Sequence, residues 1–119
     1  MLDELRERIT IYLNDHQVCV ITTNGSQGAW AVAAQYKPRS LDLDCRVPRW
    51  SDALFHIEQD PRVMVIIQDG NPLRWLQYLG LAHIADLTDN RYATIHIVPE
   101  RIDLIDKGRS WGSRDTLDI

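Results

Sequence analysis

A long hydrophobic run with a glycine near its middle is the feature that most restricts the fold of this chain. Residues 73–87 have strand-like composition, and Gly80 lies inside the run. A glycine within a long strand usually marks a bulge or a sharp bend, because it adds no side chain to the sheet. Long bent strands are typical of closed β-barrels, whose strands must tilt and curve. The run therefore predicts a barrel.

The other apolar segments also have strand patterns, and short turns separate them. Residues 41–47 alternate between apolar and polar side chains, as a half-buried strand does. The sequence NGSQG at residues 24–28 predicts a hairpin. Turns are expected at residues 37–40 and 69–72, and Pro99 is expected to interrupt a strand. The strands expected are residues 18–23, 29–36, 41–47, 63–68, 73–87, 92–98 and 101–105.

Two short helices are expected beside these strands. Residues 2–13 place apolar side chains at helical spacing. Ser51 is a suitable N-cap for the second helix, Asp52 favours its dipole, and Pro61 ends it. The apolar face of the second helix is expected to consist of Leu54, Phe55 and Ile57.

These elements predict one domain, residues 1–119, that is mainly β with short helices (α+β). Short connections favour a sheet of six to seven largely antiparallel strands with an N-terminal helix. Closure into a small barrel would remove exposed sheet edges. Residues 63–68 are uniformly apolar apart from the last, and we expect this strand to be buried on both faces.

Composition excludes several classes of function. The net charge of −4 argues against a general nucleic-acid binder, which needs a basic surface. No apolar run approaches the ~20 residues of a membrane span. Cys19 and Cys45 lie in apolar runs without a C-x-x-C pair, and we expect buried free thiols in a reducing compartment. With a charged N-terminal segment, this pattern predicts a cytoplasmic protein.

Sequence motifs for common catalytic chemistry are missing. The glycines form no phosphate-binding loop or dinucleotide fingerprint. Asp42 and Asp44 alternate along a strand, and a solvated sheet face explains the pair. We therefore predict no metal site and assign no catalytic residue. The histidines lack metal-binding spacing, and each is expected to be half-buried or exposed: His16, His56, His83 and His96.

The connection between the third strand and the second helix concentrates groups that bind phosphate. A helix N-terminus presents unpaired backbone N–H groups, and Ser51 adds a hydroxyl. Arg46 and Arg49 add guanidinium groups, and Trp50 adds a flat apolar surface. Together they would hold a phosphorylated aromatic ligand. The alternative is an exposed rim in which Ser51 is only a helix cap.

The C-terminal tail holds a second basic and aromatic group. Lys107, Arg109 and Arg114 surround Trp111 in the sequence. In a dimer this tail would cross to the neighbouring subunit and complete its pocket. The alternative is a frayed basic tail.

The segment SDALFHIEQDPRV, residues 51–63, resembles a helix of the pyridoxamine 5′-phosphate oxidase-like flavin-binding split-barrel family. In that family the helix reads S-x-K-x-x-x-L-x-x-N/D-P-R-V. Two further features fit the resemblance: VPERIDLID followed by WG near the C-terminus, and the G-x-A-x-I pattern that begins at Gly80. The resemblance implies a split β-barrel that forms a homodimer and binds FMN at the subunit interface.

The resemblance carries over to the binding residues only in part. Ser51 matches the family serine that contacts phosphate, whereas Ala53 replaces the family's basic residue and Val47 replaces a polar one. Arg46 and Arg49 are expected to replace the missing cation. The FMN-binding residues expected are Arg46, Val47, Pro48, Arg49, Trp50, Ser51 and Trp111.

The first hypothesis is a flavin-dependent oxidoreductase that acts on an unknown small molecule. The alternative is a non-catalytic dimeric split barrel that has lost FMN or binds haem, the deazaflavin F420 or a small anion. A third hypothesis is an interaction module that uses exposed tryptophans as anchors. Oxidation of phosphorylated vitamin B6 is not expected, because the arginine-led strand and the longer C-terminus that it needs are not evident.

Overall fold

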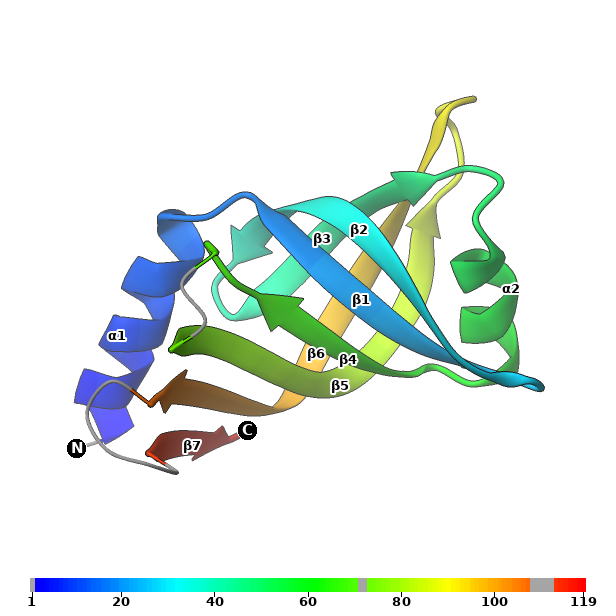
Figure 1. Ribbon diagram of the computed structural model, residues 1–119. Coiled ribbons are helices and arrows are strands. Elements are labelled where there is room, and N and C mark those ends of the chain that lie inside the picture. The colour runs from blue at the N-terminus through cyan, green and yellow to red at the C-terminus, as the bar shows by residue number, and fades with distance from the viewer. Residues whose placement is uncertain (1, 71–72, 108–112) are drawn as a thin grey trace.

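The fold is described by a computed structural model, which covers residues 2–70, 73–107 and 113–119 (Figure 1). In chain order the elements are α1 (Leu2–Asn14), β1 (Val18–Gly25), β2 (Gly28–Arg39), β3 (Asp42–Pro48), α2 (Asp52–Gln59), β4 (Arg62–Ile67), β5 (Arg74–Asp86), β6 (Tyr92–Asp106) and β7 (Arg114–Asp118).

A six-stranded antiparallel barrel closes because β6 pairs with both β5 and β3. Around the barrel the order is β1, β2, β3, β6, β5 and β4, and β4 pairs again with β1. The first half of β6 pairs with β3, and its second half pairs with β7, which lies outside the closed barrel. This is the split-barrel α+β fold with an N-terminal helix, as predicted.

Gly80 is where β5 bends around the barrel. The register with β6 shifts between Leu79 and Gly80, as the sequence predicts. A β-carbon at Gly80 would lie 2.5 Å from the carbonyl oxygen of Val98, so the two backbones can approach only because the side chain is missing. Pro99 lies opposite Gly80, where the ladder is already irregular and its missing N–H is tolerated. The predicted interruption at Pro99 is therefore wrong, and β6 is continuous.

Two other predictions about the strands are also wrong, and one strand was missed. The turn expected at residues 37–40 comes later, since β2 continues to Arg39 and Ser40 adopts a φ of 56°. No strand was expected in the tail, but residues 114–118 form β7 on the free edge of β6. β4 is not buried on both faces: Met64 and Ile66 remain partly exposed, because no helix covers the outer face of this strand.

The helices lie at opposite ends of the barrel (Figure 1). α1 covers one end with four buried side chains, Leu5, Ile9, Tyr12 and Leu13. α2 covers the other end, but its buried residues are Ala53, His56 and Ile57. Phe55 is 64% exposed, so its predicted place on the buried face is wrong; it lies beyond the stripe that contacts the barrel. Among the described residues, neither helix is long and apolar enough to cross a membrane.

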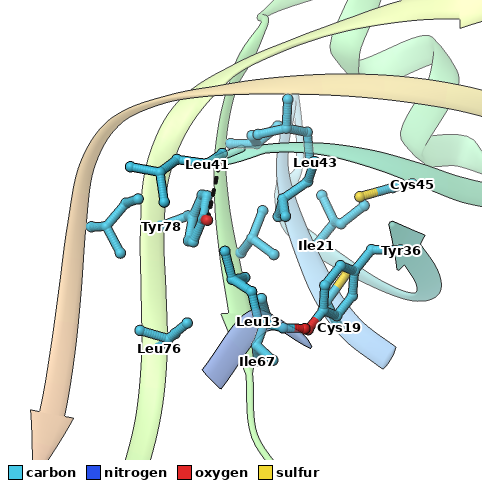
Figure 2. Packing of buried hydrophobic residues seen from close by; sticks show 14 of the residues in the cluster. Leu13, Cys19, Ile21, Tyr36, Leu41, Leu43, Cys45, Ile67, Leu76 and Tyr78 are labelled. Carbon is cyan, nitrogen blue, oxygen red and sulfur yellow. Dashed lines mark hydrogen bonds between the residues drawn. The ribbon is translucent and has the colours of Figure 1, made fainter. Parts of the chain in front are cut away.

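The barrel interior contains two tyrosines whose hydroxyls hold α1 and the β2–β3 turn against the strands (Figure 2). The Tyr36 hydroxyl donates to the carbonyl of Leu13 at 2.7 Å, and the Tyr78 hydroxyl donates to the carbonyl of Leu41 at 2.9 Å. Burial raises the pKa of both phenols, which therefore stay protonated as donors. Cys19 and Cys45 are buried free thiols, as predicted, and a hydrogen bond from the Cys45 thiol to Cys19, together with burial, raises the pKa of Cys45.

Candidate functional site

The candidate site begins where β3 ends and α2 starts. Ser51 is the N-cap of α2, as predicted, and its hydroxyl accepts a hydrogen bond of 3.2 Å from the backbone N–H of Ala53. The Ser51 N–H donates to the carbonyl of Pro48 at 3.0 Å, which fixes the turn out of β3. The first turn of α2 thus carries positive dipole charge next to the barrel. Asp52, in the same turn, offsets part of it.

A small cleft separates the first turn of α2 from the β1–β2 hairpin, and we call it the hairpin cleft. Its volume is about 170 Å³. Below it the buried Thr23 hydroxyl lies 3.0 Å from Nδ1 of the buried His56, which joins β1 to α2. The ring of Trp30 lies beside that imidazole, with centroids 5.6 Å apart. The lining residues are Thr23, Trp30, Ala31, Val32, Ser51, Asp52 and Ala53.

A second cleft lies on the outer face of the sheet, and we call it the sheet cleft. Its volume is about 260 Å³. Arg46 projects outward from β3, and its guanidinium carbon lies 4.4 Å from the centroid of the Tyr92 ring. These two residues are diagonal neighbours on paired strands, a spacing that long side chains can bridge. The lining residues are Val18, Ala33, Ala34, Gln35, Arg46, Pro48 and Tyr92.

The two clefts are neighbours along β2. Ala31 and Val32 line the hairpin cleft, and the next two residues, Ala33 and Ala34, line the sheet cleft. Of these four residues, Ala31 and Ala33 are exposed, and their small side chains leave this part of the outer surface shallow. The alanine-rich sequence of β2 thus places a shallow surface between the first turn of α2 and Arg46.

The predicted site residues do not all lie together. Arg46 and Pro48 line the sheet cleft, and Ser51 lines the hairpin cleft. The Val47 side chain is completely buried inside the barrel, so only its backbone is available to a ligand outside. The remaining predicted residues line neither cleft or cannot be placed: Arg49, Trp50 and Trp111.

Arg49 and Trp50 form the outer corner of the connection. The Arg49 N–H donates to the carbonyl of Arg91 at 2.8 Å, which ties this connection to the start of β6. Trp50 is 90% exposed and stands away from both clefts. Trp111 lies outside the described residues.

Sequence reasoning missed Thr23, Trp30 and Tyr92. All three come from strands that are distant in sequence from the β3–α2 connection. No local motif marks them: Thr23 and Trp30 pair across the β1–β2 hairpin and line the hairpin cleft, whereas the pairing of β3 with β6 brings Tyr92 to the sheet cleft.

Asp89 lies near the guanidinium of Arg46, with an N–O distance of 3.9 Å. Backbone hydrogen bonds from Arg91 and Tyr92 lower the pKa of Asp89, so this carboxylate is ionised at neutral pH. The long distance and the exposure of both side chains make this ion pair weak. Arg46 therefore keeps most of its capacity to bind another anion.

A titratable cluster crosses the β3–β6 seam beside these clefts. His96 Nδ1 lies 2.7 Å from Asp44 Oδ1, and His96 Nε2 lies 3.0 Å from Asp42 Oδ2. Hydrogen bonds to Asp44 and then to Asp42 raise the pKa of His96. Because carboxylates only accept, both ring nitrogens donate when the imidazole is charged. Among the described residues, no three His, Cys, Asp or Glu side chains are grouped to hold a metal ion.

The sequence matches no protein-family model and no curated protein. Solved structures are similar to the fold described above. General stress protein 26 from Bacillus anthracis aligns over 97% of this chain and 98% of its own, with a TM-score of 0.82 and 20% identity. A pyridoxamine 5′-phosphate oxidase-like protein from Listeria innocua aligns over 84% of this chain and 97% of its own, with a TM-score of 0.75 and 22% identity.

A heme binding protein from Mycobacterium smegmatis has the same fold over 87% of this chain and 53% of its own. The TM-score is 0.68 and the identity 14%. These likenesses confirm that the chain has the split-barrel fold that its sequence pattern resembles.

Proposed function

We propose that the chain is an FMN-binding split-barrel protein, a flavin-dependent oxidoreductase that acts on a small molecule. One observation carries the proposal. Two adjoining clefts run along the low alanine surface of β2, with the first turn of α2 at one end and Arg46 at the other. This arrangement suits a ligand that is flat in one part and anionic in another.

The residues present fit such a ligand. The short side chains of Ala31 and Ala33 allow a planar ring to approach the sheet, and Tyr92 offers an aromatic edge beside it. The backbone N–H groups of the first turn of α2, at one end of this surface, or the Arg46 guanidinium, at the other end, would compensate phosphate charge. FMN, when bound, would supply the hydride and electron transfer. The chain's own contribution is to bind and orient; we assign no side chain a proton-transfer role.

A homodimer is part of the proposal, because the outer face of the barrel is apolar beside the sheet cleft. Val20 is 40% exposed, and its register neighbours are Ala33 on β2 and Ile66 on β4. Contiguous exposed apolar surface usually marks an interaction site. Val18 belongs to this face and also lines the sheet cleft, so a second copy packed here would cover the bound ligand. The exposed apolar residues on strands β1 and β5 include Val18, Val20, Leu79 and Leu81.

The experiment is a titration of FMN into the purified protein, followed by quenching of flavin fluorescence and by the visible absorbance spectrum. We expect saturable binding by the wild type. Arg46→Gln should weaken the affinity for FMN by about tenfold, because one charge-assisted hydrogen bond is lost. Arg6→Gln, on α1 at the other end of the barrel, removes the same charge and should leave the affinity unchanged. Absence of binding at excess FMN would contradict the proposal.

A second candidate is a non-catalytic dimer that binds another ligand. Ala53 and Asp52 in the first turn of α2 favour it, because this turn carries a carboxylate and no side-chain cation. A structurally similar protein is a heme binding protein. Titration with haemin and with the deazaflavin F420, by the same spectra, separates these ligands from FMN. A protein that takes up haemin but not FMN would support this candidate.

The two buried free thiols, Cys19 and Cys45, support a reducing compartment. A cytoplasmic location stays a prediction, and cell fractionation tests it.

A further inference from the structure

A third and larger cleft lies where α1 meets the outer face of β2 and β3, and we call it the end cleft. Its volume is about 520 Å³, within the range of small-molecule sites. It shares Gln35 and Arg46 with the sheet cleft, so the two clefts adjoin. Its walls are apolar at Leu13 and Pro38 and polar elsewhere. Its polar and charged lining residues include His16, Gln35, Lys37, Asp44, Arg46 and Thr94.

The one carboxylate among these lining residues, Asp44, is already neutralised. Its Oδ1 lies 2.7 Å from Nδ1 of His96, and its Oδ2 accepts a hydrogen bond of 2.7 Å from the Arg39 guanidinium. His96 is in turn held by Asp42. Both carboxylate oxygens of Asp44 are therefore paired with His96 and Arg39, and not with Lys37 or Arg46.

The two cations of the end cleft are short of anionic partners. Lys37 stands directly opposite Asp44 in the β2–β3 register, yet among the described residues no carboxylate lies within 4.0 Å of its ammonium group. Arg46 has only the loose pair with Asp89 at 3.9 Å. The cleft thus combines a neutralised carboxylate with two positive charges on neighbouring strands.

The wall between these cations and α1 is rigid. The buried hydroxyl of Tyr36, one residue before Lys37, donates to the carbonyl of Leu13 at 2.7 Å. This bond fixes the end of α1 against β2, so both sides of the cleft are held in place. A preformed cleft loses little conformational entropy when a ligand binds.

We propose that the end cleft binds a small molecule through an oxyanion, either a carboxylate or a phosphoryl group, placed between Lys37 and Arg46. Gln35 and Thr94 line the same stretch and supply further hydrogen-bonding groups. The proposed anion site does not require FMN to be bound. Its identification as the substrate site beside the flavin rests on the proposed function.

The test uses inorganic phosphate and succinate as probes, each titrated into the protein without FMN. Binding is followed by isothermal titration calorimetry, with potassium chloride of equal ionic strength as the control for screening. We expect saturable binding of at least one probe, and the stronger of the two indicates whether the natural group is phosphoryl or carboxylate. Lys37→Gln should weaken that binding by about tenfold, and Arg6→Gln should not change it.

FMN affinity separates this inference from the proposed function. Lys37 lines the end cleft but neither of the other two, so Lys37→Gln should leave FMN binding unchanged. If neither probe binds saturably, or if Lys37→Gln and Arg6→Gln have equal effects, the anion site is overturned while FMN binding is unaffected. If FMN fails to bind but the anions bind through Lys37, the site holds and its role as a flavin substrate site is overturned.

Discussion

The hydroxyl of Thr116 on β7 donates a hydrogen bond of 2.6 Å to the carboxylate of Asp103 on β6. Asp103 is 2% exposed, and among the described residues it also lies near the guanidinium groups of Arg101 at 3.4 Å and Arg114 at 3.7 Å. A buried carboxylate is retained only when its oxygens are paired. The C-terminal strand β7 is thus attached to the barrel by its backbone pairing with β6, by the buried Leu117 and by the hydrogen bond from Thr116 to Asp103.

Thr116→Val should therefore destabilise the protein. The change keeps the shape of the side chain but removes one donor from a buried carboxylate, and we expect a loss of about 1–3 kcal/mol in the free energy of unfolding. Chemical denaturation measures it. Asp118→Ala, at an exposed position of the same strand, is the control and should change stability by less than about 0.5 kcal/mol. Equal effects of the two variants would show that Asp103 does not depend on Thr116.

His96 should make stability depend on pH. Its pKa is raised in the folded state by hydrogen bonds to Asp44 and Asp42, so the folded protein binds more protons near neutrality than the unfolded chain does. The contribution is complete below the unfolded value of 6.5 and is lost as the pH rises through the higher folded pKa. We expect the wild type to lose stability between about pH 6 and 8.5 relative to His96→Gln.

Denaturant midpoints at these two pH values measure the difference. His83→Gln is the matched control, because the His83 ring lies 5.2 Å from the His96 ring but makes neither of the hydrogen bonds to Asp44 and Asp42. If wild type and His96→Gln respond alike to pH, the imidazolium between the two aspartates does not contribute to stability.

Ser51 has a capping role that can be separated from ligand binding. Ser51→Ala removes the bond to the Ala53 N–H and should cost about 1 kcal/mol of stability. Ser51→Asp keeps a good cap, so stability should stay close to the wild type. Its added negative charge at the hairpin cleft should weaken FMN binding by at least about tenfold. If Ser51→Asp is stable and binds FMN with wild-type affinity, the phosphate of FMN does not lie next to the first turn of α2.

Val20→Asp should break the proposed dimer without unfolding the subunit. Val20 projects from the outer face of β1 between Ala33 and Ile66, so in one subunit a carboxylate there would be solvated. Buried against a second copy, the same charge would be unpaired. We expect the wild type at twice the subunit mass of 13.8 kDa and the variant at the subunit mass by light scattering. A wild type that is monomeric at all concentrations would refute the dimer.

Local chemistry in the sequence determined most of the elements. Alternation of apolar and polar residues identified the strand before the corner, the segment NGSQG located the hairpin, and Ser51 was recognised as a cap. Gly80 was the most informative single residue for the barrel, because the backbone of Val98 approaches so closely that no side chain fits at this position. These features depend on residues close in sequence, and the physics that produces them is local.

Tertiary structure decided which residues face a common cleft. Arg46, Tyr92 and Ala33 meet only because β3 pairs with β2 on one side and β6 on the other. The alternation of β3 turns Val47 into the barrel although it is adjacent to Arg46, and the α2 cap leaves Trp50 in solvent. The strand β7 also bonds to the Asp103 carboxylate on β6, a partner that no local pattern reveals. Sequence fixes the direction of each side chain along its own strand, whereas barrel closure fixes what that side chain meets.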